Sequence, residues 1–180
     1  MNPRVLFERL ADFERRVRHL YLGLGDRVTF PAEIRFFWDC MAEDEQQHLA
    51  ILERSVGLLD LMAALPHVDA AQLDRVEAIV RAAEATLSQP EISSDDAFQQ
   101  ALLVEGSELN RLDAAWFAGF TPPLRVLLQA MTPEEDIHLR RLVEAVQAYS
   151  KDKALHQQAL ALWTTYQRQH PRTLKTPLAE

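Results

Sequence analysis

The stretch MAEDEQQHL at residues 41–49 returns as MTPEEDIHL at residues 131–139, ninety residues further along the chain. Each copy contains a glutamate followed three residues later by a histidine. On a helix, side chains three residues apart lie on one face, close enough to bind the same ion or neighbouring ions. The pattern predicts two related helices that each present a carboxylate and an imidazole in one direction. The two pairs are Glu45 with His48 and Glu135 with His138.

A further glutamate precedes each pair at almost the same distance. Glu14 lies 31 residues before Glu45, and Glu105 lies 30 residues before Glu135. A proline stands at a matching place in each interval, where the chain can turn between two helices. The repeat therefore predicts two helical hairpins of one design, which pair into a four-helix bundle. The hairpins are expected over about residues 2–56 and 94–150.

Helical spacing continues through nearly all of the chain. In the first segment one stripe runs from Phe7 to Val28 through Glu14, at alternating spacings of three and four residues. Glycine is scarce, with five in 180 residues. No segment alternates apolar and polar residues for long enough to suggest a strand. These features predict an all-α fold.

The segment between the hairpins, residues 57–93, is predicted to be a long crossover that contains a short helix. Asp69 begins a capping pattern, and the short helix is expected to end near Leu87. Ser94 is expected to cap the third long helix. Pro133 is expected to kink the fourth, because proline removes one backbone hydrogen bond. The alternative is a break at this point, with Thr132 as the N-cap of a new helix.

The chain is predicted to form a single domain over residues 1–170, followed by a loose tail at 171–180. A last helix is expected near residues 151–168, with an apolar face around Leu162, Trp163 and Tyr166. That face could form a homodimer, or it could pack over one end of its own bundle. The spacing does not distinguish these two uses.

The charge and cysteine content limit the classes of partner. A formal net charge of −8 argues against nucleic acid or an anionic membrane as a partner, because both require basic surfaces. Cys40 is the single cysteine, so the sequence has no disulfide framework and no Cys-x-x-Cys metal site. The first residues lack the apolar run of a signal peptide, and no stretch is apolar enough to span a membrane. The expected location is therefore cytoplasmic.

Each of the four long helices has a glutamate near its middle, on the face that should be buried. Unpaired buried carboxylates are costly, and several together repel one another, so a positive charge is expected among them. Four carboxylates and two neutral imidazoles suit a pair of divalent ions. Mixed oxygen and nitrogen ligands favour iron or manganese, with zinc as a further alternative.

The complete pattern resembles the rubrerythrin branch of the ferritin-like superfamily. The most specific pointer is Glu105-Gly106-Ser107-Glu108, because rubrerythrins have an additional glutamate three residues after the ligand of the third helix. Tyr21, seven residues after Glu14, matches a tyrosine of that family. This chain departs from the family in having one cysteine, which excludes a rubredoxin-like domain with four. It also has no counterpart of a second family tyrosine near Leu112.

The resemblance implies a ferritin-like bundle with two iron ions that reduces hydrogen peroxide or dioxygen with electrons from an external donor. It implies that Glu108 joins the ligands in one oxidation state and that Tyr21 forms a hydrogen bond near the metals. It also implies a homodimer. Two other functions stay open: ferroxidase or iron-handling activity, and a non-enzymatic bundle that acts through an interaction surface. The metal ligands implied are Glu14, Glu45, His48, Glu105, Glu108, Glu135 and His138.

Overall fold

The computed structural model describes residues 3–59, 70–87, 91–109 and 131–169, with Gln89, Pro122 and Val126 as single residues. Within these ranges the chain forms six helices and no strand. The expectation of an all-α protein is therefore confirmed. The helices are α1 (Pro3–Gly25), α2 (Ala32–Val56), α3 (Ala70–Leu87), α4 (Ser94–Leu109), α7 (Met131–Tyr149) and α8 (Lys153–Gln169).

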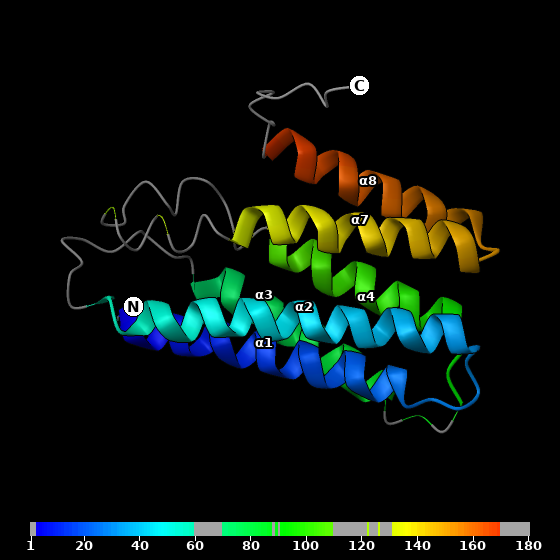
Figure 1. Ribbon diagram of the computed structural model, residues 1–180, viewed down its shortest axis with the longest axis horizontal. Coiled ribbons are helices and arrows are strands. Elements are labelled where there is room, and N and C mark those ends of the chain that lie inside the picture. The colour runs from blue at the N-terminus through cyan, green and yellow to red at the C-terminus, as the bar shows by residue number, and fades with distance from the viewer. Residues whose placement is uncertain are drawn as a thin grey trace, which may run out of the picture.

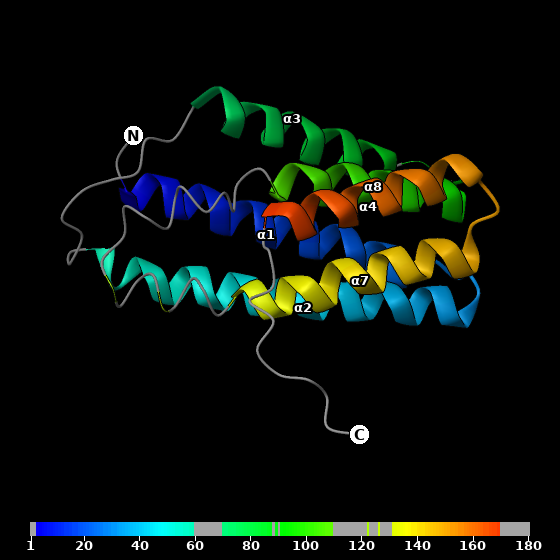
Figure 2. The ribbon, with the colours of Figure 1, turned by 90° about the horizontal axis from the view of Figure 1, so that it is seen from above.

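The helices pack lengthwise, as in a bundle (Figures 1 and 2). α1 and α2 form an antiparallel hairpin with close contact along its length, and α7 lies against both α2 and α4. α4 runs in the same direction as α2, because α3 first returns the chain along the outside of the bundle (Figure 2). α3 packs on α1 and α4, and α8 packs on α4 and α7. α1, α2, α4 and α7 thus enclose the centre of the molecule.

The stripe predicted for the first segment is buried up to the end of α1, and then the prediction fails. Phe7, Tyr21 and Leu24 are buried in the core. α1 ends at Gly25, however, and Val28 is 85% exposed in the turn that follows. The chain must reverse before α2, so helical spacing no longer decides which side chain faces inward. Phe30 occupies the core instead.

The start of α4 differs by one residue from the prediction. Ser93 is the capping residue, rather than Ser94. The Asp96 backbone N–H donates to Ser93 Oγ at 3.1 Å, and the Ser93 backbone N–H donates to Asp96 Oδ2 at 3.3 Å. These two bonds form a reciprocal capping box. Two serines followed by two aspartates allow either register, and the geometry selects the one that satisfies both N–H groups.

The crossover helix α3 agrees with the short helix predicted to end near Leu87. Its apolar side chains, such as Leu73 and Val80, are buried against the bundle. Arg16 of α1 adds polar contacts: its Nε lies 2.8 Å from Glu84 Oε1, and its Nη1 lies 3.0 Å from Glu77 Oε1. The bond to Glu84 raises the pKa of Arg16 despite partial burial. Apolar burial and these ion pairs together attach α3 to α1.

The last helix packs on its own bundle. Leu155 and Tyr166 are buried, and Tyr166 contacts Leu139 of α7. The half-buried Trp163 stacks on Tyr166 with ring centroids 5.8 Å apart. The apolar face of α8 therefore serves internal packing, but along α4 and α7 rather than over one end of the bundle as expected. The homodimer stays a prediction.

Some expectations fall outside the described residues. These are the third helix beyond Leu109, the fourth helix before Met131, the tail at 171–180 and the division into one domain over 1–170. Pro133 lies in the first turn of α7 as described, and α7 continues without interruption to Tyr149. A kink at Pro133 would change the direction of the helix relative to the preceding residues 123–130. That segment, apart from Val126, is outside the described residues, and so is the expected kink. Among the described helices, none has the length and apolar content needed to cross a membrane.

Candidate metal centre

Six of the predicted ligand side chains converge at the centre of the bundle. All six are at most 3% exposed, although each carries an ionisable group. They come from four different helices, so that no single element forms the cluster alone. The side chain of Glu108, the seventh predicted ligand, is outside the described part of the structure. The six are Glu14 of α1, Glu45 and His48 of α2, Glu105 of α4, and Glu135 and His138 of α7.

The first group that could hold an ion consists of Glu14, Glu45 and His48. His48 Nδ1 lies 3.4 Å from Glu45 Oε2 and 3.9 Å from Glu14 Oε2. The other ring nitrogen, Nε2, lies 3.7 Å from Glu135 Oε2. The two helices of the first hairpin thus supply this group, and Glu135 approaches it from α7.

The second group consists of Glu45, Glu105 and His138. His138 Nε2 lies 3.2 Å from Glu105 Oε2 and 3.3 Å from Glu45 Oε1. Glu45 belongs to both groups, with Oε2 directed to one histidine and Oε1 to the other. The two imidazole rings are 5.6 Å apart between centroids. Glu45 is therefore placed as a carboxylate that could bridge two ions.

Four of the converging side chains have a buried nitrogen or oxygen atom with no hydrogen-bond partner among the described residues. A buried polar atom without a partner is costly, and several such atoms in one place require an explanation. A bound cation provides one, because it accepts lone pairs from oxygen and nitrogen together. The atoms are Glu105 Oε2, Glu135 Oε1, His48 Nε2 and His138 Nε2.

Burial and mutual charge shift the pKa values of this cluster in different directions. Burial alone would raise the pKa of Glu105, but the charge of His138 and the hydrogen bond from Tyr21 lower it. Burial raises the pKa of Glu135, and the neighbouring carboxylates of Glu105 and Glu14 add to this effect. Burial would lower the pKa of His138, yet the charge of Glu105 raises it well above 6.5. The shifts of Glu135 and His138 therefore both favour the protonated form, which reduces the negative charge of the cluster.

Tyr21 contacts this cluster from outside. Its hydroxyl donates a hydrogen bond to Glu105 Oε1. The phenol ring is fully buried and stacks on Trp38, with ring centroids 5.5 Å apart. The packed tryptophan thus fixes the position from which Tyr21 holds Glu105.

Asp44, which no pattern in the sequence singled out, also contacts the cluster from outside. Asp44 Oδ2 lies 3.1 Å from His138 Nδ1 and also accepts a hydrogen bond from Arg141. Asp44 lies one position away from the ligand stripe, so helical spacing does not direct it towards the cluster. A signal was present in the repeat, because Asp44 aligns with a second acidic residue, Glu134. Only the packing of α2 against α7 places it on His138.

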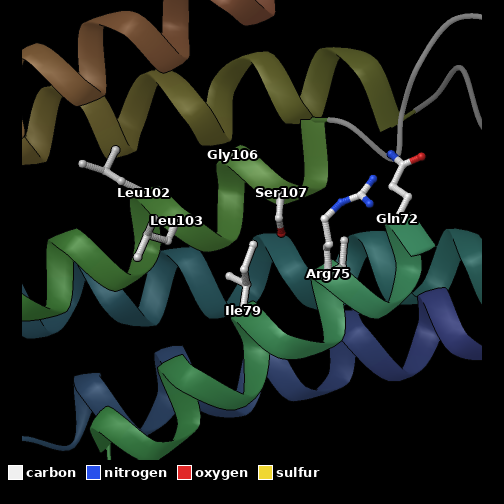
Figure 3. Close-up of a pocket in the computed structure, with 8 residues that line it drawn as sticks. Gln72, Arg75, Ile79, Leu102, Leu103, Gly106 and Ser107 are labelled. Carbon is white, nitrogen blue, oxygen red and sulfur yellow. The ribbon is translucent and has the colours of Figure 1, made fainter. Parts of the chain in front are cut away.

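A cleft of about 620 Å³ lies elsewhere, between α3 and α4 (Figure 3). Ile79, Leu102 and Leu103 line it together with the polar side chain of Arg75. None of its described lining residues is a carboxylate or a histidine. It is therefore separate from the Glu/His cluster and offers no metal ligands.

Comparison with family models, with curated proteins and with solved structures finds no match to this chain. The class is therefore defined by the geometry alone. The chain is an all-helical protein with two buried Glu/His groups that could hold metal ions. Their shared glutamate makes the arrangement resemble a carboxylate-bridged metal site.

Proposed function

We propose that the protein is a ferritin-like di-metal oxidoreductase of the rubrerythrin type. It binds two iron ions and reduces hydrogen peroxide or dioxygen with electrons from an external donor. The observation that carries this proposal is the set of buried, unsatisfied ligand atoms on α2, α4 and α7 around one centre. Manganese and zinc are the alternative metals, because oxygen and nitrogen ligands suit them also.

The arrangement of the helices supports the ferritin-like part of the proposal. α1 and α2 form one antiparallel pair, α4 and α7 also run antiparallel to each other, and α3 packs on the outside against α1 and α4 (Figure 2). Di-iron bundles of this class take one glutamate from each of two helices and a Glu-x-x-His pair from each of the others. The cluster has this composition, with one Glu-x-x-His pair on α2 and the other on α7.

The residues present fit two divalent ions. Glu14 and His48 would hold one ion, Glu105 and His138 the other, and Glu45 would bridge them. Glu135 would complete the set near His48, and Glu108 would serve as the additional ligand suggested by the rubrerythrin pattern. Two divalent ions would offset the four buried glutamates, which together are unfavourable without them.

The chain itself would position the metals and exclude water. A reduced iron pair would supply the two electrons that cleave the O–O bond of a peroxide. Tyr21 would hold Glu105 in one orientation through its hydroxyl. Asp44 would orient the imidazole of His138. The buried ring of Trp38 stacks on Tyr21 and would support the orientation of Glu105.

The test is metal content followed by peroxide turnover. Protein purified without added metal, and then loaded with ferrous iron, should contain about two ions per chain and consume peroxide when a reductant is supplied. Glu45→Ala and His138→Ala should lose both properties. Glu53→Ala is the matched control, because Glu53 is an exposed glutamate of the same helix. Peroxide turnover that is unchanged in the first two variants would refute the proposal.

The same preparation separates the other functions. Aerobic oxidation of ferrous iron well beyond two equivalents per chain, without peroxide turnover, would assign iron handling instead. A protein that binds no metal, yet is active in its pathway after all ligand substitutions, would act through an interaction surface.

A further inference from the structure

The two metal positions differ in how firmly the surrounding residues hold their ligands. From this difference, and resting on the proposed function, we infer that the two positions fill in order. The position formed by Glu45, Glu105 and His138 fills first, and the position of Glu14 and His48 fills second.

His138 is held in the orientation that metal binding requires. Its Nε2 points to the oxygens of Glu45 and Glu105, and its Nδ1 lies 3.1 Å from Asp44 Oδ2. A carboxylate only accepts hydrogen bonds, so Nδ1 carries the hydrogen and, in the neutral ring, Nε2 presents its lone pair to the centre. Arg141 donates to Asp44 and holds it in turn. The ring therefore needs no reorientation before it binds an ion.

Glu105 of the same position is also held from outside. The Tyr21 hydroxyl binds one carboxylate oxygen, Oε1, and leaves Oε2 directed at His138. Tyr21 cannot easily move away, because it is fully buried and stacked on Trp38. Two of the three ligands in this position are thus oriented before an ion arrives.

The other histidine is placed differently. Both ring nitrogens of His48 face carboxylates of the cluster: Nδ1 faces Glu45 and Glu14, and Nε2 faces Glu135. Among the residues that the structure describes, neither nitrogen faces an acceptor outside the cluster that would assign the hydrogen to it. An ion that binds here must first select the ligating nitrogen and fix the ring, and this ordering lowers its affinity.

Charge alone would favour the opposite order. Each position has one histidine and shares Glu45, but Glu135 brings a third carboxylate close to His48, whereas the additional carboxylate beside His138, that of Asp44, is paired with Arg141. If Coulomb attraction decided the order, the His48 position would fill first. The order of filling therefore distinguishes ligand orientation from net charge as the deciding effect.

The experiment is a titration of the metal-free full chain with Co²⁺. Calorimetry and the visible absorption of the bound ion measure binding at each addition. We expect two resolved steps of one equivalent each. His48→Ala should lose the second step and retain the first, whereas His138→Ala should lose the first. Circular dichroism and thermal melting of each metal-free variant establish that it is folded.

Two conservative variants test the outer contacts directly. Asp44→Asn and Tyr21→Phe leave every proposed ligand in place, and each should weaken the first step about 10- to 100-fold. The second step should change much less. Glu43→Gln is the matched control, because it removes an exposed carboxylate from the same turn of α2 and should leave both steps unchanged.

Other results of these titrations would overturn the proposed order of filling or the proposed function. Binding of two ions in a single step, loss of the first step in His48→Ala, or unchanged affinity in both Asp44→Asn and Tyr21→Phe would overturn the order while leaving the proposed function in place. Failure of the unmodified chain to bind two ions would overturn the proposed function as well.

Discussion

At the scale of single residues, the Glu/His cluster gathers ionisable groups whose charged forms are unfavourable when buried together. Glu135 shows this most clearly. It is 1% exposed, and burial together with two neighbouring carboxylates raises its pKa. Ionisation of this group in the metal-free protein is therefore unfavourable, although the ionised form is the one that binds a cation.

Glu135→Gln should consequently stabilise the metal-free protein. The amide has the shape of the protonated carboxyl group and cannot ionise, so a gain of about 1 kcal/mol is expected, or roughly 2–4 °C in melting temperature. Thermal melting at pH 8 in the presence of a chelator measures this. The same variant should bind metal more weakly. A lower melting temperature than that of the unmodified protein would contradict the interpretation.

The pKa of His138 predicts how the stability of the metal-free protein depends on pH. This pKa is raised in the folded state, mainly by the charge of Glu105 against the opposing effect of burial. A raised value means that the protonated ring stabilises the fold below pH 6.5. That contribution is lost as the pH rises from 6.5 through the folded pKa.

Melting curves of the chelated protein between pH 6 and pH 9 should therefore show decreasing stability. His138→Gln should reduce this dependence, because the glutamine does not titrate. Stability that instead increased over this range would show that His138 is not the dominant titrating group.

At the scale of elements, the attachment of α3 depends on one arginine that contacts two glutamates. Arg16→Ala removes the bonds to Glu84 and Glu77. The side chain of Arg16 is 21% exposed, that of Glu84 is 39% exposed and that of Glu77 is 23% exposed. Partial exposure to water limits the loss to about 1 kcal/mol of unfolding free energy. Urea unfolding measures this change.

The control for this prediction is Arg15→Ala on the same helix. Arg15 and its partner Glu53 are about half exposed and 3.4 Å apart, so a change of less than about 0.5 kcal/mol is expected. Equal effects of the two substitutions would show that the contacts of Arg16 do not attach α3.

At the scale of the whole molecule, metal binding should couple the four central helices. An ion that binds the folded chain but not the unfolded chain stabilises the fold by about 2.7 kcal/mol at a free concentration of 100 Kd. For a domain of this size the melting temperature should rise by roughly 5–10 °C. Calorimetric scans with and without metal measure the rise.

The matched comparison uses Glu45→Ala, which removes the shared ligand. Its melting temperature should be almost independent of added metal. An equal increase in this variant would mean that the metal binds elsewhere on the chain.

Much of this architecture could be predicted from the sequence, because helical spacing is a local property. The period of Phe7, Glu14 and Tyr21 identifies one face of a helix without knowledge of its neighbours. The repeat of Glu45 and His48 in Glu135 and His138 likewise identifies the inward faces of α2 and α7. An all-α fold and the candidate ligands follow from these two patterns.

The tertiary structure decided the features that depend on contacts between helices. Asp44 contacts His138 across 94 positions of the chain, and no spacing within α2 indicates that contact. Val28 continues the helical stripe in sequence but lies in a turn, because chain reversal ended α1 first. Periodicity determines which face of a helix is apolar, whereas the side chain that meets it depends on how two helices pack in space.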